Sequence, residues 1–91
     1  MNIGIIGLGL IGSSLASALK SVNGSYMIYG FDTLKEHENA ALQQGFFDGI
    51  KTFEDLKNND VIFLAVPVEE IISTLKKLKD ISPNTTLIDM G

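Results

Sequence analysis

The chain alternates short apolar runs with longer stretches in which apolar residues recur every three or four positions. The apolar runs predict five buried strands, at residues 2–6, 26–31, 46–51, 61–65 and 85–89. The stretches between them predict helices that begin near Leu10, Leu34, Thr52 and Pro67. The pattern therefore indicates strands and helices in alternation.

Local signals mark the ends of the predicted helices. Thr33 and Glu36 fit a capping box, so the second helix is expected to begin near Leu34 and to stop at Gly45. The periodicity also groups residues on one face of the first and the last predicted helix. On the first helix this face consists of Ile11, Ser14, Leu15, Ala18 and Leu19. On the last helix it consists of Val68, Ile71, Ile72, Leu75 and Leu78.

The predicted strands are continuous apolar runs, and they lack the in-and-out alternation of a sheet that is exposed on one face. Such strands, separated by helices, predict an α/β fold with a parallel sheet and helices on both faces. Right-handed crossovers then give the strand order 3-2-1-4-5. We expect one domain that spans residues 1–91.

Composition narrows the possible functions. The 91 residues carry 11 acidic and 7 basic side chains, and the net charge of −4 disfavours a nucleic-acid partner. The absence of cysteine excludes a disulfide framework, a zinc-thiolate site and a cysteine nucleophile. The spacing of histidine and carboxylates predicts no metal site.

The first twenty residues are apolar enough to be compared with a secretory signal or a membrane helix. A signal would carry positive charge before its apolar core, but the first basic residue is Lys20. A membrane helix would rarely place glycine at positions 4, 7, 9 and 12. The chain is therefore expected to be cytoplasmic, with no membrane partner.

A glycine motif lies between the first strand and the first helix. Gly7-Leu8-Gly9-Leu10-Ile11-Gly12 has the G-x-G-x-x-G spacing of a dinucleotide-binding turn in a Rossmann-type fold. Gly7 would allow a sharp turn, Gly9 would let a phosphate approach the backbone, and Gly12 would let the helix lie close to the strand. Free amides at the helix start would then bind the pyrophosphate. The alternative is a glycine-rich turn without a ligand.

Asp32 ends the second strand, 20 residues beyond Gly12. A carboxylate at this place accepts hydrogen bonds from the adenosine ribose and repels a 2′-phosphate, which favours NAD over NADP. The alternative is that Asp32 only caps the next helix, but Thr33 is the better-placed cap. Lys35 weakens the preference for NAD, since a nearby cation tolerates a phosphate.

Ala65-Val66-Pro67 follows the fourth strand, at the edge where ligands bind in such sheets. We expect this segment to line the cofactor site, although a tight turn before a helix explains the same residues. His37, the single histidine, is expected to be an exposed helical residue without a catalytic role.

The opening residues 5–16 resemble those of prephenate and arogenate dehydrogenases. Later segments agree with that family in order, namely Gly30-Phe31-Asp32, Ala41-Leu42-Gln43-Gln44-Gly45 before Asp48, Phe63-Leu64-Ala65-Val66-Pro67 and Ile88-Asp89-Met90-Gly91. The resemblance implies the N-terminal NAD-binding domain of an enzyme that oxidatively decarboxylates prephenate in tyrosine biosynthesis. It also implies a homodimeric parent protein.

In the resembled family, the sixth strand, the catalytic histidine and a C-terminal helical domain for substrate and dimerisation lie beyond the part that this chain covers. We therefore expect a fragment that is truncated before the sixth strand, without catalytic residues and inactive by itself. Alternatives are an arogenate dehydrogenase, another oxidoreductase whose nucleotide domain resembles that of 6-phosphogluconate dehydrogenase, and a non-catalytic NAD sensor. Fold alone does not exclude the sensor.

Overall fold

The computed structural model describes residues 1–90 and contains five strands, four α-helices and one 3-10 helix within that range. The strands are β1 (Asn2–Ile6), β2 (Met27–Phe31), β3 (Gly49–Ile50), β4 (Val61–Leu64) and β5 (Thr86–Asp89). The helices are α1 (Leu10–Val22), α2 (Lys35–Gln44), α3 (Phe53–Leu56), η1 (Val68–Glu70) and α4 (Ile71–Lys77).

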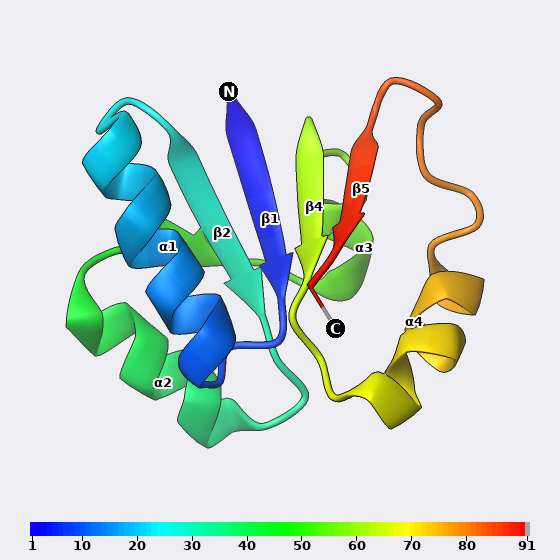
Figure 1. The fold of residues 1–91 in the computed structure, drawn as a ribbon, viewed down its shortest axis with the longest axis horizontal. Helices are drawn as coiled ribbons and strands as arrows, with labels where there is room; N and C mark the ends of the chain where they lie inside the picture. Colours follow the sequence, from blue (N-terminus) through cyan, green and yellow to red (C-terminus); the bar gives the residue numbers. More distant parts are fainter. Residues whose placement is uncertain (91) are drawn as a thin grey trace.

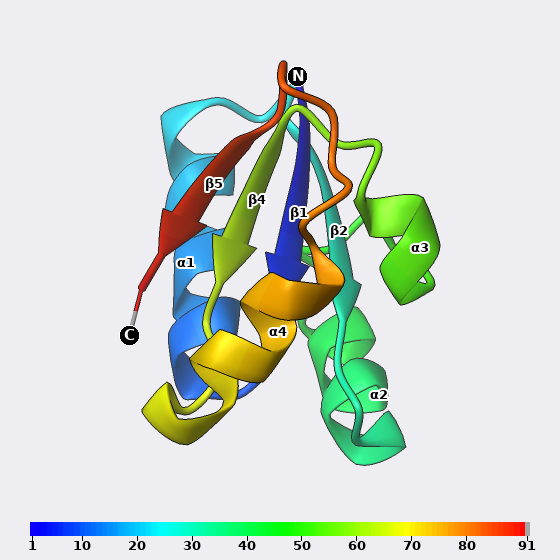
Figure 2. The ribbon, with the colours of Figure 1, turned by 90° about the vertical axis from the view of Figure 1, so that its right-hand side faces the viewer.

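All five strands pair in parallel, in the order β3-β2-β1-β4-β5. This confirms the predicted topology. Because the strands run in one direction, their carboxyl ends meet at one edge of the sheet, and α1, α2 and α4 begin near that edge (Figures 1 and 2). The chain direction thus gathers three strand-to-helix turns in one place.

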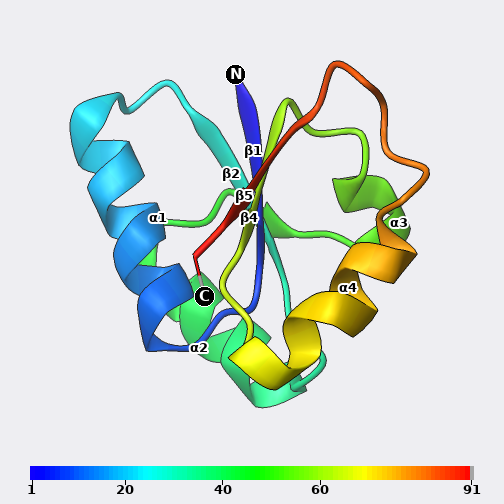
Figure 3. The ribbon, with the colours of Figure 1, turned by 45° about the vertical axis from the view of Figure 1, so that its right-hand side comes forward.

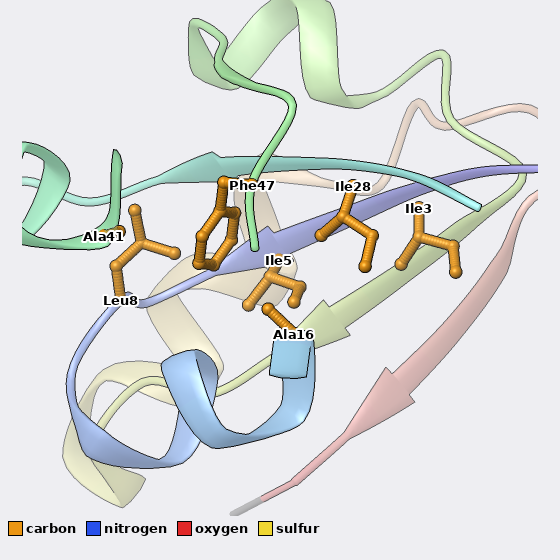
Figure 4. Close-up of a cluster of buried hydrophobic side chains, with 7 residues drawn as sticks. All are labelled: Ile3, Ile5, Leu8, Ala16, Ile28, Ala41 and Phe47. Carbon is orange, nitrogen blue, oxygen red and sulfur yellow. The ribbon is translucent and has the colours of Figure 1, made fainter. Parts of the chain in front are cut away.

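The sheet is covered on both faces, by α1 and α2 on one side and by α3 and α4 on the other (Figure 3). Figure 4 shows the first buried cluster, which contains Ile3, Ile5, Leu8, Ala16, Ile28, Ala41 and Phe47. The second cluster contains Ile6, Leu56, Ile62, Leu64 and Leu78. Neighbouring residues of β1 point to opposite faces, so an apolar run such as Ile5-Ile6 contributes to both clusters.

The third strand is much shorter than predicted, and the last helix begins with a turn of different geometry. The third strand is only Gly49–Ile50, because Phe47 places its ring in the first cluster and pairing with β2 begins when Asp48 N–H bonds the Ile28 carbonyl. The last helix begins with the 3-10 turn of η1 directly after Pro67 and ends at Lys77.

The two helix faces that the periodicity indicates are only partly buried. On α1, Ile11, Ser14 and Ala18 are exposed, and the fully buried positions are Gly12 and Ala16. The helix lies so close to the sheet that small residues occupy the centre of the contact, while larger side chains pack at its border. On α4 and η1, Val68, Ile72 and Leu75 are likewise exposed, and Ile71 and Leu78 are buried.

The predicted capping box of the second helix is also wrong. The N-cap of α2 is Leu34, without a side-chain cap, and Asp32 Oδ1 accepts the Leu34 N–H at 2.8 Å. The expected C-terminus is confirmed, since Gly45 adopts a left-handed conformation with a φ of 82°. Thr52 caps α3 as its sequence indicates, by accepting the Asp55 N–H at 3.2 Å.

Candidate functional site

A cleft of about 730 Å³ opens at the carboxyl edge of the sheet. Four parts of the chain form its walls. They are the β1–α1 turn, the connection from the end of β2 to the start of α2, helix α3, and the segment from β4 to α4. The lining residues are Ile6, Gly7, Gly9, Leu10, Ile11, Phe31, Asp32, Thr33, Leu34, His37, Phe53, Ala65, Val66, Pro67, Glu70, Ser73, Thr74 and Lys77. The volume is in the range of small-molecule sites.

The three glycines of the motif serve different purposes in this turn. Gly7 has a φ of 100°, and a Cβ there would lie 2.6 Å from the Ala65 carbonyl oxygen. A Cβ on Gly12 would collide with the Gly7 carbonyl oxygen, so this glycine allows α1 to approach the turn. At Gly9, no described atom lies within 4 Å of the position that a Cβ would take. Gly7 and Gly12 are thus required for packing, whereas Gly9 leaves free space in the cleft.

The start of α1 is suited to an anion. Gly9 is its N-cap, the first intrahelical bond runs from Ser13 N–H to Gly9 O, and no side chain among the described residues caps this end. The first turn contains no acidic residue that would occupy the amides. Free N–H groups and the positive end of the helix dipole therefore face the cleft wall formed by Leu10 and Ile11.

Asp32 connects this turn to β2. Its Oδ2 accepts the Leu8 N–H at 2.7 Å and lies 3.0 Å from His37 Nδ1, and its Oδ1 accepts the Leu34 N–H. Partial burial raises the pKa of Asp32, but these hydrogen bonds outweigh burial and hold the pKa below its ordinary value of 3.8. The carboxylate therefore stays ionised, in a position fixed by both neighbouring turns.

Comparison with known proteins assigns the fold a family. The family model for the nucleotide-binding domain of prephenate dehydrogenase matches residues 15–91. The chain belongs to this family. The prephenate dehydrogenase of Lactococcus lactis is 36% identical over 90 residues, which cover 96% of this chain and 25% of that protein.

Two solved structures of dehydrogenases superpose on the whole nucleotide-binding domain. The prephenate dehydrogenase of A. aeolicus, in complex with hydroxyphenyl propionate and NAD⁺, gives a TM-score of 0.91 at 29% identity. The arogenate dehydrogenase of Synechocystis gives a TM-score of 0.88 at 31% identity. Each match covers 100% of this chain and 33% of the other, so the chain spans a quarter to a third of the length of these relatives.

The cleft of this nucleotide-binding domain brings together most of the residues that the sequence suggested. Gly7, Gly9, Leu10, Ile11, Asp32 and Ala65-Val66-Pro67 all line it. Leu8 and Gly12 do not, because the Leu8 side chain lies in the first cluster and Gly12 packs against the turn. Contact of these residues with a dinucleotide stays a prediction.

The part of the cleft formed by β2, α3 and α4 was not predicted from the sequence. Phe31, Phe53, Thr74 and Lys77 line the cleft from β2, α3 and α4, and no sequence pattern indicated that these elements converge. A weak signal did exist in α4, because Thr74 and Lys77 are three residues apart and therefore share a helix face.

The expectation for His37 needs correction. Its side chain is 44% exposed, yet it lines the cleft and contacts Asp32. The physical reason is that α2 begins only three residues after Asp32, so its first turn lies over the end of β2. Within residues 1–90, no group of acidic and histidine side chains is arranged to hold a metal ion. None of the helices in this range is long and apolar enough to cross a membrane.

Proposed function

We propose that this chain, as one domain over residues 1–91, binds NAD for a prephenate dehydrogenase. The observation that carries the proposal is the bond from Leu8 N–H to Asp32 Oδ2. This bond joins the glycine turn that follows β1 to the carboxylate at the end of β2, and both line the same cleft. Those are the two contacts that a dinucleotide needs at such a sheet edge.

The described residues fit this cofactor. The open space at Gly9 admits a pyrophosphate, and the uncapped amides at Leu10 and Ile11 can donate to it. The ionised Asp32 can accept from a ribose hydroxyl and disfavours a 2′-phosphate, so we expect NAD to bind more tightly than NADP. The NAD⁺ complex of the A. aeolicus relative supports this choice.

The parent protein is proposed to be an oxidoreductase in which bound NAD accepts a hydride from prephenate. We propose that these 91 residues supply the cofactor-binding part of that enzyme and no catalytic residue. The Synechocystis structure makes arogenate the alternative substrate. A cytoplasmic location and a homodimeric parent complete the proposal.

Calorimetry with NAD and NADP on the full natural chain tests the cofactor assignment. The wild type should bind NAD at least about tenfold more tightly than NADP, which corresponds to about 1.4 kcal/mol. Asp32→Ala should reduce this difference. Asp48→Ala, which changes an aspartate far from the cleft, is the control and should leave the difference unchanged. Equal affinities of the wild type for the two dinucleotides would remove the ribose role of Asp32, and no binding of either would remove the function.

A further inference from the structure

Few acceptor positions of the Asp32 carboxylate remain free for a ligand. A carboxylate offers about four such positions. Leu34 N–H uses one on Oδ1, while Leu8 N–H and His37 Nδ1 both approach Oδ2. The adenosine ribose of a dinucleotide presents neighbouring 2′ and 3′ hydroxyl donors at this place. Asp32 can therefore accept from one of them, and the other needs a second acceptor.

His37 has such an acceptor. An ionised carboxylate can only accept, so the hydrogen of the Asp32–His37 bond belongs to Nδ1. The neutral ring then carries its lone pair on Nε2, on the other side of the imidazole. Since the side chain lines the cleft and is 44% exposed, a bound molecule can approach the imidazole from the cleft.

We propose that His37 is a specificity-determining residue that recognises the 2′ position of the adenosine ribose beside Asp32. This inference rests on the proposed function. A neutral His37 accepts a hydrogen bond from the 2′-hydroxyl of NAD. A protonated His37 instead donates and carries a positive charge, which favours the 2′-phosphate of NADP. The preference for NAD is therefore expected to decrease when the imidazole of His37 carries a second proton.

Charged side chains surround His37 on four elements, β2, α2, η1 and α4. Asp32 contacts it from β2, and Glu36 and Glu38 flank it on α2, where Glu38 Oε2 accepts the Asp32 N–H at 3.2 Å. Glu70 and Lys77 line the same cleft from η1 and α4. Carboxylates and ammonium groups ordinarily keep their charge over the range in which histidine titrates. A pH effect that is present in the wild type and absent from a His37 variant is therefore assigned to His37.

The test is calorimetry with NAD and NADP on the full natural chain at about pH 5.5 and about pH 8.5, on either side of the histidine range. Relative to His37→Gln, the wild-type NADP-to-NAD affinity ratio should rise about tenfold at the lower pH, as expected for one charge-assisted hydrogen bond. His37→Gln retains a donor and an acceptor without a titrating charge, so its ratio should change much less. The 2′-phosphate itself titrates near pH 6, and that contribution is common to both proteins.

Two further variants make the result independent of folding defects. His37→Lys keeps a positive charge at both pH values, so its ratio should be high at both. Glu36→Gln, a neighbouring change that does not touch the cleft lining, should behave like the wild type. An NADP-to-NAD affinity ratio that changes with pH equally in the wild type and in His37→Gln would overturn the inference. If NAD does not bind the wild type at either pH, the proposed function itself fails.

Discussion

Asp32 and Asp48 lie at opposite edges of the same sheet and have similar local chemistry. Each carboxylate accepts a backbone N–H from another part of the sheet layer, Leu8 for Asp32 and Ile28 for Asp48, at 2.7 and 2.8 Å. In each case burial raises the pKa, and hydrogen bonds from the partners outweigh burial, so that the pKa lies below its ordinary value.

Their partners differ. Asp48, at the amino edge, pairs with Lys20 at 2.8 Å, and the same ammonium group donates to the Tyr26 carbonyl. Asp32, at the carboxyl edge, pairs with His37 beside the cleft. A lowered pKa therefore marks a structural connection at both edges, and only the neighbouring cleft indicates a binding site at one of them.

The largest effect should come from Gly12→Ala, which tests whether packing at the carboxyl edge depends on the close approach of α1. The added methyl group would collide with the Gly7 carbonyl oxygen, which belongs to the backbone and cannot rotate away as a side chain could. We expect a loss of unfolding free energy of about 3 kcal/mol or more, measured by urea denaturation. Near wild-type stability would show that α1 can shift without cost.

The next largest effect distinguishes NAD binding at the carboxyl edge from packing, by comparing one glycine at each edge of the sheet. Gly9→Ala and Gly24→Ala both add a methyl group where no described atom lies within 4 Å, and neither glycine has a positive φ. Both variants should fold normally. Gly9→Ala should weaken NAD binding about a hundredfold by displacing the pyrophosphate from the amides, and Gly24→Ala should not change it. Equal NAD affinities in calorimetry would contradict the position of the phosphate site.

A smaller effect compares the two aspartates directly. Asp32→Ala and Asp48→Ala each leave a partly buried N–H without its acceptor, so each should lower the free energy of unfolding by about 1–3 kcal/mol. Only Asp32→Ala should also weaken NAD binding, by about tenfold. Thermal unfolding with and without NAD measures both quantities. A loss of NAD affinity in Asp48→Ala equal to that in Asp32→Ala would erase the distinction between the edges.

The smallest expected effect is a loss of unfolding free energy at low pH. Because both folded-state pKa values are lowered, the two carboxylates contribute stability that is fully present above their unfolded-state pKa and is lost as the pH falls through the folded-state values. Circular dichroism in urea should show a free energy of unfolding that decreases as the pH falls below about 4, the ordinary aspartate pKa. The decrease should be smaller in Lys20→Gln, since Asp48 then loses its cationic partner. An equally steep decrease would mean that this ion pair contributes nothing.

The sequence predicted those parts of the molecule that depend on local rules. The strand order, the turn at Gly7, the close approach at Gly12 and the helix end at Gly45 follow from apolar runs and from positions that only glycine tolerates. The capping box is absent because α2 begins one residue later than Thr33 predicts, with Leu34 as its N-cap, and Asp32 accepts the Leu34 N–H.

Features that depend on contacts between distant segments were not predictable in this way. Phe53 and Lys77 reach the cleft because α3 and α4 cross the same face of the sheet, which no local pattern encodes. Helical periodicity favoured Ile11 over Ala16 on the buried face, since it counts hydrophobicity and does not register how closely a helix approaches a sheet.

The hydrogen bond between Leu8 and Asp32 also limits how nucleotide preference can be engineered. Replacing Asp32 with a small neutral residue would remove an electrostatic obstacle to an extra phosphate, but it would also release the backbone of the glycine turn. An asparagine retains an oxygen acceptor for the Leu8 amide, so redesign and evolution are both expected to pass through side chains that keep this anchor. Charge and loop rigidity are thereby coupled in a single residue.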